Sequence, residues 1–216
     1  MFLTDAEADA INAQVAGAEL RTGVEVVTAI VGKSDTYVEL PWKAFALGGS
    51  LASFGVVIAD VWRPDWVTAA TALLHAVTIL GAAAASALLA VFVPAFGRLF
   101  LRATRVEIEV RQHAQSLFLT RELFRTPQRT AVLVLISLFE RRIEILPDTG
   151  LHDRVTDADW HTVIARMTPR LRDARPFHAL QDGLAALEAL LAAKGFRGDT
   201  ARDDLLSDRP IEERGA

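Results

Sequence analysis

Four acidic side chains have the type and placement that metal binding would need: Glu25, Asp35, Asp148 and Asp153. Each lies in or beside a turn at one end of a predicted strand. Calcium takes six to eight oxygen ligands, many of them loop carboxylates and backbone carbonyls. The loop DTGLHDRV places Asp148 and Asp153 around Gly150, although their spacing is not that of an EF-hand. These acids are therefore candidate ligands for calcium or another divalent cation, while solvated turn carboxylates are the preferred interpretation of each.

Other residue types that carry out catalysis give weaker signals. The chain has no cysteine, which excludes a phosphatase with a cysteine nucleophile. Asp157 and Asp159 have the spacing of an aspartate nucleophile and its acid, but they follow a loop and not a buried strand. With Thr156 before them, they are typical of the capped first turn of a helix. No histidine pair has the i, i+4 spacing of a zinc site on one helix. The five histidines are His75, His113, His152, His161 and His178. No catalytic residue is assigned.

Three short apolar strands are expected to position the acids. Residues 24–31 (VEVVTAIV) and 130–137 (TAVLVLIS) are almost continuously aliphatic, which is typical of strands buried on both faces. Residues 142–147 alternate isoleucine with charged residues and predict a half-exposed strand. Because crossover connections are right-handed, the first two strands should be parallel and the third antiparallel to them.

This topology separates the acids into two groups. Asp148 should lie at the end of the sheet where Glu25 begins, with Asp153 in the following loop. Asp35 should lie at the opposite end, beside Glu140, where ligands of open parallel sheets usually bind. Both ends stay open as candidate sites.

Amphipathic helices flank these strands. Thr4 and Glu7 form a capping box for a helix over residues 5–20. A second helix is predicted over residues 102–124, and a third begins after Thr156. A last helix ends at Gly195, and residues 197–216 are expected to be a flexible tail.

Two long apolar stretches, residues 44–62 and 67–96, interrupt this α/β pattern. About 20 apolar residues span a bilayer as a helix, so both stretches are long enough. Only the polar turn from Arg63 to Trp66 separates them, and Trp42, Trp62 and Trp66 are expected at interface depth. We therefore expect a transmembrane helical hairpin, whose small face of Gly and Ala residues either closes the hairpin or docks a partner helix. The small residues are Gly48, Ala52, Gly55, Ala59 and Gly81.

Basic residues predict the orientation of the hairpin. Its turn contains Arg63 alone, whereas several Lys and Arg residues lie near its two outer ends, which favours cytoplasmic termini. These basic residues are Lys33, Lys43, Arg98, Arg102, Arg105 and Arg111. The N-terminus lacks the basic and apolar regions of a cleavable signal. A formal net charge of −4 gives no indication of a nucleic-acid partner.

Several strings resemble the TPM domain family, also described as a TPM phosphatase domain. They are TGVEVVTAIV (22–31), AVLVLISLFERRIEILPDTGL (131–151), VTDADWHTVI (155–164) and RPFHALQDGL (175–184). The resemblance covers residues 2–37 and 98–195, and it implies a small Rossmann-like sandwich with a mixed sheet. Relatives include plant and cyanobacterial thylakoid proteins linked to photosystem repair, some described as acid phosphatases and some as binding calcium. This chain differs from them because the hairpin is inserted after the first strand.

The predicted organisation is an α/β domain in two parts, 1–43 and 97–196, around a hairpin at 44–96 and before a tail at 197–216. The preferred hypothesis is a bacterial inner-membrane protein whose cytoplasmic TPM-like domain assists assembly or quality control of a membrane complex. Its partners would be the lipid bilayer and another membrane protein. The alternative is a divalent-metal-dependent phosphatase, which rests on the family resemblance.

Overall fold

The computed structural model describes residues 2–63, 68–198 and 209–215. The chain forms two compact units, one of Met1–Asp35 with Val106–Ala216 and the other of Thr36–Arg105. In chain order, the elements are α1 (Asp5–Thr22), β1 (Glu25–Val31), α2 (Glu39–Trp62), α3 (Ala69–Phe92), α4 (Pro94–Gly97), η2 (Arg98–Phe100), α5 (Ala103–Thr120), η3 (Leu123–Arg125), β2 (Ala131–Ser137), β3 (Arg142–Pro147), η4 (Thr149–Leu151), α6 (Asp157–Arg172), α7 (Pro176–Ala193) and β4 (Ile211–Glu213).

The first unit is built on a four-stranded mixed sheet with the order β3-β2-β1-β4. β1 pairs in parallel with β2, with Glu25 opposite Ala131, and β2 pairs antiparallel with β3, with Ser137 opposite Arg142. Every residue of β1 and β2 is buried, whereas burial alternates along the first part of β3. The predicted α/β fold with a mixed sheet, and the direction of each of these three strands, are therefore confirmed.

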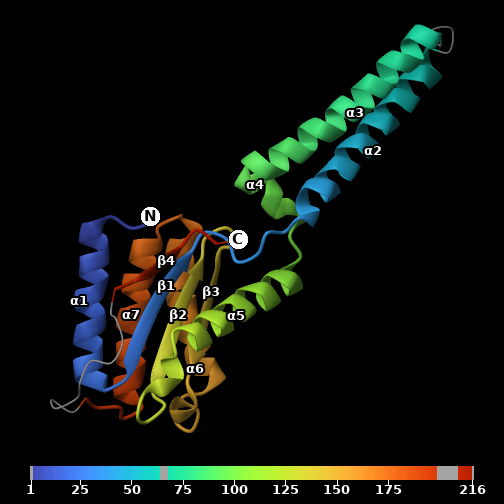
Figure 1. Cartoon of the computed structure of the whole chain (residues 1–216). Coiled ribbons are helices and arrows are strands. Elements are labelled where there is room, and N and C mark those ends of the chain that lie inside the picture. Colours follow the sequence, from blue (N-terminus) through green and yellow to red (C-terminus); the bar gives the residue numbers. More distant parts are fainter. Residues whose placement is uncertain (1, 64–67, 199–208, 216) are drawn as a thin grey trace. The chain divides into compact units, whose positions relative to one another are not determined.

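Helices cover both faces of the sheet (Figure 1). Alternate strand residues such as Val26, Val134 and Ile145 pack with α1, α6 and α7 in one hydrophobic core. The intervening residues of β1 and β2 are also buried, and α5 lies on their side of the sheet (Figure 1). Two-sided burial explains why both central strands are continuously apolar.

Local signals define the ends of two helices in this unit. The Thr4 side chain accepts a hydrogen bond from the Glu7 N–H, and Glu7 accepts one from the Thr4 N–H, so the predicted capping box is present. Thr156 and Asp159 form the same reciprocal pair at the start of α6. Asp159 is therefore a capping residue, as the helix-start interpretation predicted. Gly23 ends α1 with φ 70°, a left-handed conformation that glycine adopts at little cost.

The prediction of a flexible tail from residue 197 misses a strand. β4 pairs in parallel with β1, with Ile211 opposite Ala29 and Glu213 opposite Val31. The Glu212 carboxylate accepts hydrogen bonds of 2.9 Å from the backbone N–H groups of Phe2 and Leu3. These bonds join segments about 210 residues apart, which a local reading of composition cannot anticipate.

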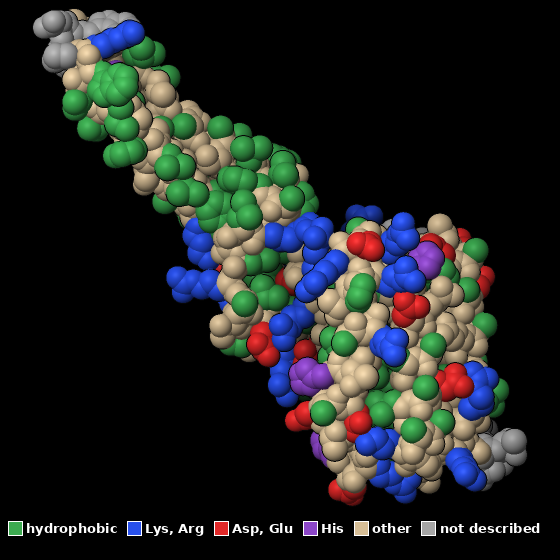
Figure 2. Space-filling model, turned by 180° about the vertical axis from the view of Figure 1, so that it is seen from behind, with side chains coloured by type: hydrophobic (Ala, Val, Ile, Leu, Met, Phe, Trp, Pro, Cys, Tyr) green, Lys and Arg blue, Asp and Glu red, His purple; other side chains and the backbone are tan. Residues whose placement is uncertain are grey.

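The second unit contains the two apolar helices, α2 and α3. Each has 24 residues and is long and apolar enough to cross a membrane. Only 6 % of the apolar stretch of α2 and 11 % of that of α3 are buried, so neither has the surroundings of a soluble core helix. Hydrophobic side chains cover the hairpin along its length in Figure 2. Pro64, Asp65 and Trp66 of the predicted turn lie outside the described residues.

Small residues form the contact between α2 and α3. A Cβ on Gly48 would overlap the side chain of Ser86, and Ala83 is almost fully buried. Gly55 and Gly81, in contrast, have no heavy atom within 4 Å of an added Cβ. The predicted small-residue face is thus divided, because Gly48 closes the hairpin while Gly55 and Gly81 face outward.

Candidate functional site

Asp148 is the most completely engaged of the predicted site residues. Its backbone N–H extends the β3 ladder by donating to the Ala131 carbonyl at 2.8 Å, and only 3 % of the residue is exposed. The Arg129 guanidinium donates Nε–H to Oδ2 at 2.8 Å and Nη2–H to Oδ1 at 2.9 Å. The Thr149 N–H donates to Oδ1 at 2.7 Å. The two-pronged geometry between guanidinium and carboxylate is the strong, directional kind of ion pair.

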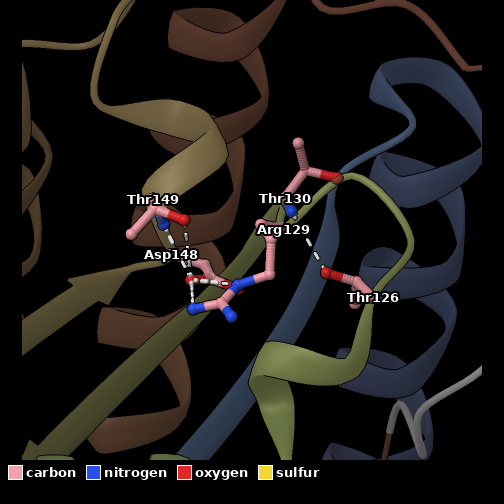
Figure 3. Close-up of polar contacts among 5 residues, drawn as sticks. All are labelled: Thr126, Arg129, Thr130, Asp148 and Thr149. Atoms are coloured by element: carbon pink, nitrogen blue, oxygen red, sulfur yellow. Dashed lines mark hydrogen bonds and ion pairs between the residues drawn. The ribbon is translucent and has the colours of Figure 1, made fainter.

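The loop before β2 holds Arg129 in place (Figure 3). The Arg129 backbone has φ 54°, and the Arg129 N–H donates a hydrogen bond to the Thr126 carbonyl at 3.0 Å. The Thr126 side-chain oxygen also accepts a hydrogen bond of 3.1 Å from the Thr130 N–H. The Gly150 N–H donates to the Arg129 carbonyl, and an added Cβ on Gly150 would overlap the Gln128 carbonyl. The turn therefore needs glycine at position 150 to bring Arg129 and Asp148 together.

Glu25 and Asp153 do not complete a metal site around Asp148. Glu25 begins β1 at the same end of the sheet, as predicted, and is only 4 % exposed. Asp153 is exposed in the turn after η4. Both Asp148 oxygens already accept hydrogen bonds from Arg129, so a cation would have to displace a guanidinium. As they are arranged, these residues do not fit a calcium site.

Asp35 lies at the opposite end of the sheet, four residues beyond the end of β1. Its neighbour Ser34 donates a backbone hydrogen bond to Glu140 Oε1 at 2.9 Å, which confirms the predicted proximity of this segment to Glu140. The Ser34 hydroxyl donates to Ser137 Oγ at 2.9 Å, and the Ser137 hydroxyl donates to Glu140. Ser137 is fully buried, so a substrate cannot reach its hydroxyl. This chain of hydrogen bonds fastens the two strand ends together.

No group of three or more His, Cys, Asp or Glu side chains is arranged to hold a metal ion within residues 2–63, 68–198 and 209–215. The histidines of the described chain are dispersed among other partners. His113 lies 3.2 Å from Glu213, His75 lies 3.6 Å from Asp60, and His161 Nδ1 lies 2.7 Å from the Asp157 carbonyl. These contacts join pairs of residues and create no zinc-type cluster.

Sequence reasoning missed two residues of these clusters. Arg129 stands in the polar segment RTPQRT, and nothing local pairs it with an acid 19 residues later. Ser137 ends an apolar strand, and a terminal polar residue at that position was the one available signal for a hydrogen bond at the strand end.

The family comparison gives the decisive match. The model of the TPM domain matches residues 72–190, which is more than half of the chain. The chain belongs to the TPM domain family. The matched range of this TPM protein includes β2, β3, α5 and α6, whereas α1 and β1 precede it.

A solved structure has the same fold as this TPM protein. The NMR structure of the BA42 protein from the psychrophilic bacterium Bizionia argentinensis aligns with a TM-score of 0.59 and 16 % sequence identity. The alignment covers 98 % of this chain and 96 % of BA42. At this identity the likeness concerns the fold alone. The comparison with curated proteins finds no match.

Proposed function

We propose that this TPM protein is an integral membrane protein of the bacterial inner membrane whose domain faces the cytoplasm. Its domain works as an interaction module in the assembly or quality control of membrane complexes. The observation that carries the proposal is the exposure of α2 and α3, two 24-residue apolar helices in which few residues are fully buried. In water such a surface would be strongly unfavourable, whereas in lipid it is the ordinary surface of a hairpin.

The distribution of charge supports the orientation. Glu39, Lys43 and Arg105 form a small ion-pair network at the open end of the hairpin, with Arg105 Nη1 2.9 Å and Lys43 Nζ 3.7 Å from Glu39 Oε1. Arg98 and Arg102, which follow the second apolar helix in the sequence, add positive charge to this end of the hairpin. Since cytoplasmic flanks are enriched in Lys and Arg, this end belongs on the cytoplasmic side.

The arrangement of the acids favours an interaction role over hydrolysis. Asp148 is neutralised by Arg129, Asp159 caps α6, and Glu140 ties two strand ends. Each of these carboxylates therefore has a structural task. None of them is paired with an accessible nucleophile or base among the described residues.

Two experiments test the proposal in sequence. Alkaline carbonate extraction should leave the full chain in the membrane pellet, and its release into the supernatant would contradict the two spans. Affinity purification in mild detergent should then recover a stoichiometric membrane partner, with an unrelated two-span protein bearing the same tag as the control. Recovery of the chain alone, as a monomer or homo-oligomer, would contradict the interaction role.

A further inference from the structure

The open end of the hairpin carries an excess of positive charge. We call this end the hairpin base; it consists of residues 36–43 at the start of α2 and residues 93–105 after α3. Four basic side chains and one acidic side chain belong to it, so its net charge is +3. These side chains are Lys43, Arg98, Arg102 and Arg105, with Glu39 as the acid. Among the described residues at the other end of the hairpin, Asp60 and Arg63 balance each other.

Tertiary contacts assemble the hairpin base from two distant segments. Val93 is extended, with φ −113° and ψ 96°, and Pro94 follows it, so α3 ends and the chain turns. α4 and η2 then return the chain to α2, which both of them contact. The Lys43 ammonium donates to the Phe100 carbonyl at 3.4 Å, across 57 residues of chain. The basic cluster is therefore a folded feature and not only a property of the flanking sequence.

The one acid of the hairpin base is already paired. Glu39 Oε1 lies 2.9 Å from Arg105 Nη1 and 3.7 Å from Lys43 Nζ. A single carboxylate thus faces two cations and can neutralise only one of them. The two other arginines of the hairpin base add positive charge, and no further acid belongs to it.

The positive excess persists when the flanking residues are counted. Residues 33–43 and 98–107 together contain five basic and three acidic side chains. One of these acids, Glu107, is already paired with Arg142, whose Nη2 lies 3.2 Å from Glu107 Oε1. Arg102, in contrast, is exposed and forms no hydrogen bond or ion pair with a described residue. The hairpin base is therefore complementary to an anion.

Large apolar side chains are exposed beside this charge. Trp42, Phe92 and Leu99 are 72 %, 76 % and 74 % exposed. Two of them adjoin basic residues in the chain, Lys43 and Arg98. Figure 2 shows Lys and Arg side chains where the hydrophobic surface of the hairpin ends. A soluble acidic partner would leave the apolar side chains in water, whereas a phospholipid offers acyl chains to them and a phosphate to the cations.

We propose that the hairpin base binds the headgroup of an anionic phospholipid in the cytoplasmic leaflet. Arg98 and Arg102 are the principal partners of the phosphate, and the acyl chains lie along Trp42 and Leu99. A guanidinium group matches phosphate oxygens in a two-pronged geometry, whereas an ammonium group acts as a point charge. This inference rests on the proposed insertion of the hairpin into the membrane, and it specifies the class of lipid that the hairpin base selects.

The test uses the full chain in nonionic detergent micelles that contain equal amounts of phosphatidylglycerol and phosphatidylcholine with the same acyl chains. Native mass spectrometry measures how much of each lipid remains bound. Wild type should retain phosphatidylglycerol in preference, because only this lipid has a net negative charge. Inorganic phosphate, added at the concentration of the phospholipid, should not displace it, because phosphate provides no acyl chain for the apolar side chains.

Protein variants provide the second arm. Arg102→Gln, at an exposed position, should lower the ratio of retained phosphatidylglycerol to phosphatidylcholine by roughly fivefold, and Arg98→Gln in the same chain should lower it further. The charge-preserving pair Arg98→Lys and Arg102→Lys should keep most of the preference. Arg166→Gln with Arg172→Gln removes two positive charges from exposed positions on α6, and this control should leave the ratio unchanged.

Three results would overturn the inference. They are equal retention of the two lipids by wild type, equal ratios for Arg102→Gln and the α6 control, and displacement of phosphatidylglycerol by inorganic phosphate. Displacement by a soluble heptapeptide of glutamate would assign the hairpin base to an acidic protein partner instead. If the chain resists carbonate extraction but retains both lipids equally, the headgroup site fails while membrane insertion stands. Release by carbonate, in contrast, would contradict the insertion itself.

Discussion

Arg129 and Asp148 form a two-pronged ion pair in which Nε lies 2.8 Å from Oδ2 and Nη2 lies 2.9 Å from Oδ1. The pair joins the loop before β2 to the turn after β3, and it uses the carboxylate that the sequence offered as a metal ligand. The arginine is half exposed, whereas the aspartate side chain is 2 % exposed. The acid at this end of the sheet therefore stabilises the fold.

Asp148→Ala should lower the free energy of unfolding by about 1–3 kcal/mol, because it removes the partner of Arg129 and the acceptor of the Thr149 N–H. The half-exposed position of Arg129 limits the loss, since water can solvate the freed guanidinium. Urea unfolding of the detergent-solubilised chain measures the change. Asp153→Ala, an exposed acid in the same turn, should change stability by less than about 0.5 kcal/mol. A calcium affinity that disappears in the first variant without loss of stability would contradict the structural role.

Gly48→Ile should destabilise the hairpin, whereas Gly55→Ile should not. A side chain at position 48 would overlap Ser86 across the contact of α2 and α3, while position 55 has open space around it. Overpacking of a close contact typically costs about 1–3 kcal/mol. The thermal unfolding midpoint in detergent compares the two variants. Equal midpoints would show that α2 and α3 do not pack through Gly48.

Asp159 should make stability depend on pH in acid solution. The Lys194 ammonium, followed by the N–H and hydroxyl of Thr156, lowers the pKa of Asp159 from 3.8 to about 2. A lowered folded-state pKa contributes stability above the unfolded value and loses it as the pH falls through the folded value. Wild type should therefore have a higher unfolding midpoint than Asp159→Asn. This difference should be largest at pH 6 and shrink between about pH 4 and pH 2.

Asp157→Asn is the matched control for this pH series. Asp157 lies in the same helical turn, and its side chain makes no hydrogen bond among the described residues. At pH 6, Asp157→Asn should change the unfolding midpoint less than Asp159→Asn does, because it removes no side-chain hydrogen bond or ion pair. A wild-type advantage over Asp159→Asn that grows as the pH falls would contradict the assigned pKa direction.

Much of the fold follows from local pattern. The predicted span of β3 is the observed one, Arg142–Pro147, because alternation of isoleucine with charge has no helical equivalent. Continuous apolar runs predicted β1 and β2 to within one residue. α2, in contrast, begins at Glu39, five residues before the predicted apolar start, since a helix can continue through charged residues outside the apolar region.

The features that sequence reasoning missed depend on contacts between distant segments. β4 has three residues and no apolar alternation, so its place beside β1 follows from tertiary pairing. The Glu212 bonds to Phe2 and Leu3 and the Arg129 bonds to Asp148 are equally non-local. Asp148 was found because its residue type is visible in the sequence, whereas Arg129, which neutralises it, was identified only in the folded chain.

Thiol labelling of single-cysteine variants tests the central claim most directly, since the chain contains no cysteine of its own. Arg63→Cys places a thiol at the end of α2, and Asp9→Cys places one on the exposed face of α1. In intact spheroplasts, a membrane-impermeant maleimide should label position 63, whereas position 9 should react only after the membrane is permeabilised. Labelling of position 9 in intact spheroplasts, or protection of position 63, would contradict a hairpin that crosses the membrane with the TPM domain in the cytoplasm.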